Sequence, residues 1–205
     1  NNTVKTEPDY AGAAIKAQDG ASQKAELNIT SSNSSDELNV TAEADAIKSS
    51  GDLSISGPGT VNTTSTASDG IEAKGDLSIT GSSTVNATGG TEGIQSGGNA
   101  TIDSSGTVIA KGGEGAGIDT GGDLIIKGGG QVEASSKETL AVDTGGSLTV
   151  TNASLNASGV EYGVYAYKGI TLDHATVTVR TSEGGGQAIA LFTDEDDIVI
   201  KNGSI

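Results

Sequence analysis

Aliphatic residues recur at nearly constant intervals along most of this chain. They anchor one repeating position, occupied by Ile15, Ile47, Ile71, Ile94, Ile118, Val142, Val164 and Ile189. From Ile47 onward, successive anchors are 22 to 25 residues apart. A fixed period in this range is the signature of a repeat architecture, in which similar units stack on one another. The chain is therefore expected to fold by stacking rather than around one globular core.

Residues 69–88, DGIEAKGDLSITGSSTVNAT, show what one unit contains. Apolar and polar residues alternate in its segments LSI and TVN, which indicates short strands with one buried face. Gly, Asp, Asn and Ser separate these segments as turn residues. Three short strands and three turns per unit predict an all-β fold, a single-stranded parallel β-helix (solenoid) of about eight coils of about 23 residues.

Two more aliphatic columns repeat with the same period as the anchors. One holds a pair in each unit: Leu53 and Ile55, Leu77 and Ile79, Ala100 and Ile102, Leu124 and Ile126, Leu148 and Val150, and Ile170 and Leu172. The other holds Val61, Val85, Val108, Val132, Leu155 and Val177. Because inward residues of stacked coils lie over their equivalents, these columns predict a core of aliphatic ladders. The aromatic content of only 2% and the absence of Trp agree with such a thin core.

The charge of the chain limits its partners. Its 205 residues carry a formal net charge of −16, so nucleic acid and anionic membranes would be repelled. No run approaches the roughly 20 apolar residues of a membrane span. We therefore expect no nucleic-acid partner and no membrane insertion, whereas divalent cations become plausible ligands.

The domain organisation is interpreted from the spacing of the anchors. Residues 1–44 are predicted to form an irregular first coil and N-terminal cap, with Leu27, Ile29, Leu38 and Val40 facing inward. Residues 45–205 are predicted to form the regular coils. The last strand would end at Ile205 with an open sheet edge, which proteins usually cover. We therefore expect the chain to be joined to further domains of a longer protein.

The tandem form DGI(E)xxGDLSITGxxTVNAT, and above all ASDGIEAKGDLSIT, resembles a bacterial family of secreted carbohydrate-binding-domain proteins. The resemblance spans about residues 45–180. It implies a right-handed parallel β-helix, an extracellular location (secreted or at the cell surface), and binding of pectin-type polygalacturonate and calcium. The leading Asp of the motif becomes Glu92 and is then lost from Ala116 onward, which would confine a family cation site to the first three regular coils.

Two columns of acidic residues are the candidate metal ligands. One comprises Asp45, Asp69 and Glu92, before the first strand of each unit; the other includes Asp52 and Asp76, in the turn before the second strand. Carboxylates one coil apart, about 4.8 Å, repel unless they are neutralised. Calcium is a hard cation that collects such oxygens from loops. The alternative is that these side chains accept backbone N–H bonds in Asx-type turns.

Aromatic residues gather in one coil, where Tyr162, Tyr165 and Tyr167 are candidate carbohydrate-binding residues. Exposed rings can stack on sugar faces while their hydroxyl groups stay hydrated. The alternative is a structural ring stack of Tyr167 with Phe192, which the alignment of the units places at the same position. Glu72, Gln95, Asp119 and Asp143 share another column, which is expected to be an outward, solvated acidic stripe.

Catalysis is not expected. The single arginine, Arg180, lies far along the repeat from the acidic columns, and the turns are too short to wall a cleft. The sequence therefore predicts a non-catalytic carbohydrate-binding module that recognises acidic polysaccharide through bound calcium. The alternatives are a stalk or adhesin segment of a larger surface protein and, less strongly, a polysaccharide lyase or glycoside hydrolase. In the last coil, residues 193–196 (TDED) are expected to bulge outward as a three-residue insertion.

Overall fold

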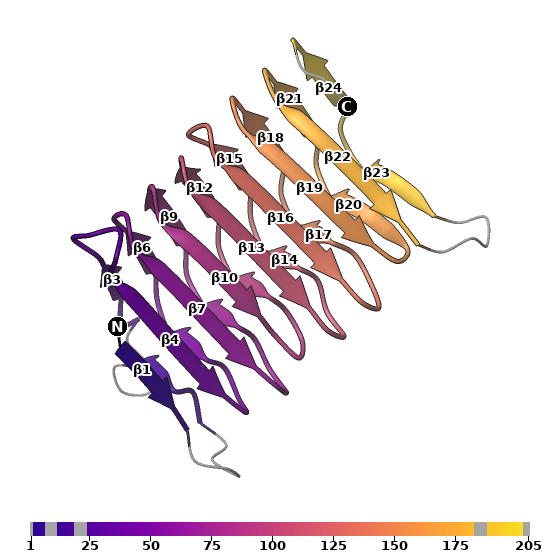
Figure 1. Ribbon diagram of the computed structural model, residues 1–205. Helices are drawn as coiled ribbons and strands as arrows, with labels where there is room; N and C mark the ends of the chain where they lie inside the picture. Colours follow the sequence, from indigo (N-terminus) through magenta and orange to yellow (C-terminus); the bar gives the residue numbers. More distant parts are fainter. Residues whose placement is uncertain (1, 7–11, 19–23, 183–187, 203–205) are drawn as a thin grey trace.

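The structure is a parallel β-solenoid of about seven turns, seen in a computed structural model that describes residues 2–6, 12–18, 24–182 and 188–202. The chain winds through three sheets in turn, and each sheet contains eight parallel strands. The coils lie side by side in sequence order, which makes the molecule an elongated rod (Figure 1). The predicted all-β parallel β-helix is confirmed, and the described residues contain no helix.

The strands of the three sheets follow the repeat. Sheet A comprises β1 (Asn2–Lys5), β4 (Glu37–Ala42), β7 (Thr60–Ser65), β10 (Thr84–Thr88), β13 (Thr107–Gly112), β16 (Gln131–Ser136), β19 (Ser154–Gly159) and β22 (Thr176–Thr181). Sheet B comprises β2 (Ile15–Ala17), β5 (Ile47–Ser49), β8 (Ile71–Ala73), β11 (Ile94–Ser96), β14 (Ile118–Thr120), β17 (Val142–Thr144), β20 (Tyr162–Ala166) and β23 (Ile189–Thr193). Sheet C comprises β3 (Leu27–Thr30), β6 (Leu53–Ser56), β9 (Leu77–Gly81), β12 (Ala100–Ser104), β15 (Leu124–Lys127), β18 (Leu148–Thr151), β21 (Ile170–Asp173) and β24 (Ile198–Lys201).

The aliphatic columns form the predicted ladders. In sheet B, each anchor pairs in register with the anchor of the next coil, from Ile15 to Val164. The anchors from Ile47 to Val164 are 0% exposed. The columns of sheets A and C keep the same register, for example Val85 with Val108 and Ile79 with Ile102. Like side chains therefore pack on like throughout the core, which needs no aromatic residue.

The last anchor was predicted wrongly. Val164 pairs with Leu191, whereas Ile189 pairs with Tyr162 and is 37% exposed. Leu191 is seven positions before Ile198, and the equivalent spacing from Val164 to Ile170 is six. The connection between these two strands is thus one residue longer here rather than three. Segment 193–196 also stays in the stack, because the backbone N–H groups of Glu195 and Asp196 bond to the coil below.

The first and last coils use the same three sheets. In the segment 1–44, strands β2, β3 and β4 pair in register with β5, β6 and β7. Val40 is buried, and Leu27, Ile29 and Leu38 pack partly buried against the core, as predicted. The predicted last strand at Ile205 lies outside the described residues, and the strand that pairs with β21 is β24. None of the described elements is an apolar helix long enough to cross a membrane.

Candidate functional site

The turn column that contains Asp52 and Asp76 forms a hydrogen-bonded ladder. Each side-chain oxygen Oδ1 accepts a bond from the backbone N–H of the equivalent residue in the next coil: Asp52 from Asp76 (2.8 Å), Asp76 from Asn99 (2.8 Å), Asn99 from Asp123 (2.9 Å) and Asp123 from Ser147 (2.8 Å). Acceptance of backbone N–H bonds was the alternative to metal binding, but these bonds join successive coils instead of closing a local Asx-type turn. Asn99 accepts such a bond without carrying a charge, so the ladder does not depend on a cation.

The ladder also explains the glycine that precedes these residues. A Cβ atom at Gly75 would lie 2.1 Å from Oδ1 of Asp52, and one at Gly98 would lie 2.2 Å from Oδ1 of Asp76. Both distances are far below van der Waals contact. Only glycine lets the carboxylate of one coil approach the backbone of the next so closely.

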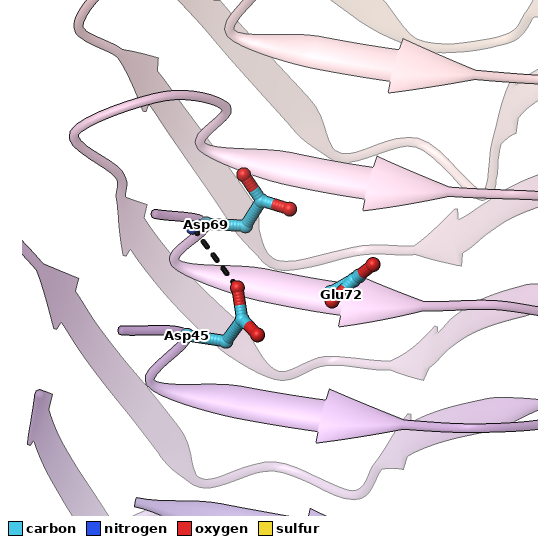
Figure 2. Close-up of side chains that lie close together, drawn as sticks. All are labelled: Asp45, Asp69 and Glu72. Carbon is cyan, nitrogen blue, oxygen red and sulfur yellow. Dashed lines mark hydrogen bonds between the residues drawn. The ribbon is translucent and has the colours of Figure 1, made fainter. Parts of the chain in front are cut away.

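The second acidic column lies at the start of sheet B strands. Asp45 and Asp69 precede β5 and β8, and both are buried. Figure 2 shows their carboxylates one above the other, with Glu72 further along β8. Oδ1 of Asp45 accepts bonds from the Ser68 hydroxyl and from the backbone N–H of Asp69, the latter at 3.3 Å. The same pattern recurs one coil on, where Asp69 accepts from Thr91 and from the N–H of Glu92 at 3.2 Å.

Glu72 is the functional candidate that the sequence analysis placed wrongly. It was expected to be solvated, but it is only 2% exposed. Its carboxylate contacts the ammonium groups of Lys48 and Lys74. Lys48 also donates to Oδ2 of Asp45 at 2.8 Å, so one ammonium lies between the two acidic side chains. The signal in the sequence was the repeat itself, because Lys48 occupies the position of Glu72 one coil earlier.

Asp45, Asp69 and Glu72, which we call the early cluster, each offer one oxygen within 4.8 Å of the others. Three such carboxylates fit the donor set of a hard cation such as Ca²⁺. Lys48 already supplies a positive charge there, so a metal ion would have to displace its ammonium. The predicted ligand Glu92 lies against Asp69, whereas Asp52 and Asp76 belong to the separate ladder.

The protonation of the early cluster differs between its members. Burial alone would raise the pKa of Asp45, but hydrogen bonds from Lys48 and Ser68 outweigh it and lower that pKa. Burial and a hydrogen bond with the Glu92 carboxyl group raise the pKa of Asp69 to about 6. The Asp69 carboxyl group therefore holds a proton more readily than an ordinary aspartate does.

Three aromatic residues, Tyr162, Tyr165 and Phe192, form a cluster on sheet B. Together with Tyr167, which directly follows β20, they make up what we call the aromatic ledge. The rings of Tyr165 and Phe192 are stacked, with centroids 5.7 Å apart and an interplanar angle of 23°. Tyr162 lies 5.7 Å from Phe192 and 6.5 Å from Tyr165. The predicted pairing of Phe192 with Tyr167 is wrong, because Phe192 is in register with Tyr165. Tyr167 is instead 42% exposed.

Acidic groups surround the aromatic ledge. The Tyr165 hydroxyl donates to Oδ2 of Asp194 at 2.5 Å, and the Tyr167 hydroxyl is hydrogen-bonded to Glu195. The hydrogen bond to Asp194 raises the pKa of Tyr165 to about 12. Asp143 is in register with Tyr165, and Asp119 is in register with Asp143.

Asp119 and Asp143 differ from the early cluster in their charge balance. Both are half-buried, and burial raises the pKa of each carboxyl group; repulsion from Asp143 adds to the shift of Asp119. Across the part of the chain that the structure describes, neither carboxylate forms an ion pair with a lysine or arginine.

Comparisons with protein-family models, curated proteins and solved structures found no match. The family resemblance carried by the repeat motif therefore stays a hypothesis.

Proposed function

We propose that this chain is a non-catalytic carbohydrate-binding module whose glycan contacts lie on the aromatic ledge. The observation that carries the proposal is the grouping of Tyr162, Tyr165 and Phe192 on one sheet, next to an exposed Tyr167. Ring faces bind the apolar faces of pyranose sugars, and phenol and carboxylate groups bind their hydroxyls. The rigid stacked coils beneath would hold these groups in place for binding without reorganisation.

Position within the repeat supports this assignment. One outward residue per coil in sheet B forms a continuous column: Lys16, Lys48, Glu72, Gln95, Asp119, Asp143, Tyr165 and Phe192. Except at Glu72, which is only 2% exposed, a polysaccharide lying along the rod would meet this column one coil at a time. A secreted or cell-surface location is part of the same proposal.

Calcium-mediated binding of acidic polysaccharide is the second candidate, favoured by the closeness of the three carboxylates of the early cluster. In that arrangement a Ca²⁺ ion would be held by Asp45 and Asp69, and uronate carboxylates would complete its coordination. The predicted ligands Glu92, Asp52 and Asp76 are engaged in other hydrogen bonds, which makes this candidate weaker.

A glycan array with and without Ca²⁺ tests the proposal. We expect glycan retention that persists in chelator, is lost in Tyr167→Ala, and is unchanged in Thr64→Ala, which alters an exposed residue of β7 in an early coil. Release of shortened oligosaccharides would contradict the non-catalytic assignment. Absence of retention under all conditions would contradict binding altogether and favour the stalk or adhesin interpretation.

A further inference from the structure

Among the described residues, the carboxylates around the aromatic ledge have no lysine or arginine partner. Asp143, Asp194 and Glu195 adjoin Tyr165 and Tyr167, and none of them forms an ion pair among the described residues. Lys168 follows Tyr167 directly but also forms no ion pair there. The ledge therefore combines aromatic faces with uncompensated negative charge.

In the early cluster, by contrast, lysine residues of the chain neutralise two of the carboxylates. On the same outward column, Lys48 places its ammonium between Asp45 and Glu72, and Lys74 adds a second cation. Near the ledge, the equivalent positions hold Asp143 and Tyr165 instead of lysine. An ammonium group brought by a ligand would have the same role at the ledge that Lys48 has in the early cluster.

We propose that the aromatic ledge recognises an amine-bearing saccharide, an amino sugar whose ammonium lies against the rings of Tyr165 and Tyr167 and pairs with Asp143, Asp194 or Glu195. Cations are attracted to the faces of aromatic rings, and the attraction increases when the site is partly desolvated. An anionic saccharide would be repelled here, because the nearby carboxylates and the net charge of −16 share its sign. This inference rests on the proposed function and names the substrate class of that site.

The test compares oligosaccharides of equal length that carry positive, zero or negative charge. Calorimetric titration at pH 6 would use glucosamine oligomers, the corresponding N-acetylglucosamine oligomers, and oligogalacturonate. We expect the glucosamine oligomer to bind at least roughly tenfold more tightly than its acetylated counterpart, and oligogalacturonate not to bind.

Variants separate a specific site from general attraction of a cation to an acidic protein. Asp194→Asn should remove most of the preference for the amine. Glu114→Gln, which removes one exposed charge before β14, two coils away from β20, should leave it unchanged. Tyr167→Ala should weaken binding although it preserves the net charge.

Three results would overturn the inference. Equal or tighter binding of the acetylated oligomer would do so while leaving the carbohydrate-binding proposal intact. Equal weakening by Asp194→Asn and Glu114→Gln would show that the attraction is not localised at the ledge. Failure of every glycan to bind would instead remove the proposed function together with this inference.

Discussion

The early cluster and the aromatic ledge lie along the same sheet, yet of these two regions only the early cluster has carboxylates that form ion pairs among the described residues. In the early cluster, Lys48 and Lys74 neutralise Asp45 and Glu72 within the chain. At the ledge, Asp143 and Asp194 have no such partner among the described residues. The contrast indicates that acidic residues in a repeat can be structural in one coil and available to a ligand in another.

The largest expected effect is on stability, when the internal cation of the early cluster is removed. Lys48→Met leaves Asp45 and the buried Glu72 without this partner, so we expect the free energy of unfolding to fall by about 3 kcal/mol. Lys127→Met is the matched control, because the Lys127–Asp103 pair is exposed, and it should cost less than about 1 kcal/mol. Urea unfolding measures both. Similar losses in the two variants would contradict internal neutralisation.

Calcium gives the next largest effect, and it separates the two candidate functions. Because Lys48 occupies the early cluster, we expect millimolar Ca²⁺ to leave the melting temperature of the unmodified chain unchanged. In Lys48→Met the freed carboxylates should bind the ion, and the melting temperature should rise by mass action. Thermal unfolding with Ca²⁺, and with Mg²⁺ as the control, measures this. A rise in the unmodified chain that Asp69→Asn abolishes would support calcium-mediated binding instead.

A smaller effect concerns pH. The folded-state pKa of Asp69, about 6, exceeds the ordinary value of 3.8, so between these values the folded state holds more protons than the unfolded state. The free energy of unfolding should therefore increase as pH falls from 7 toward 5. The raised pKa values of Asp119 and Asp143 act in the same direction.

Asp69→Asn isolates this contribution, because asparagine keeps the acceptor oxygen for Thr91 and Glu92. At pH 7 the variant should be more stable than the parent by an amount on the order of 1 kcal/mol, and the gain should shrink as pH falls and vanish only near the unfolded-state pKa of 3.8. Unfolding curves at several pH values would show it. A gain that is independent of pH would mean that ionisation of Asp69 is not its cause.

The smallest effect compares single carboxylates in the two regions. Asp143→Asn removes a charge that burial disfavours, so it should stabilise the fold by less than about 1 kcal/mol. Asp45→Asn removes a charge that Lys48 stabilises, so it should destabilise the fold. The same sign for both changes would show that the two regions do not differ.

The sequence predicted the coils well because each inward position is repeated with the same period. It failed at Ile189, where Ile189 and Leu191 are two positions apart and both suit the alternation of the strand. When the preceding connection changes length, the spacing cannot decide which of the two residues faces inward.

The candidate sites were predicted less completely. The role of Asp52 and Asp76 in backbone bonding was foreseen as an alternative, since turn aspartates commonly accept N–H bonds. The burial of Glu72 was missed, because its position in the repeat indicates that it points outward. That position does not show that the lysine side chains of neighbouring residues cover it. The contacts of Asp194 and Glu195 with the ledge depend on the final coil, whose register was misjudged.

The most direct test of the contrast is a pair of NMR titrations of isotope-labelled protein with a glucosamine oligomer and with Ca²⁺, followed residue by residue through the backbone amide signals. We predict that the oligomer shifts signals around Asp143, Tyr165, Tyr167 and Asp194, and that neither ligand shifts those around Asp45, Asp69 and Glu72. Shifts at the early cluster with either ligand, and none at the aromatic ledge, would contradict this account.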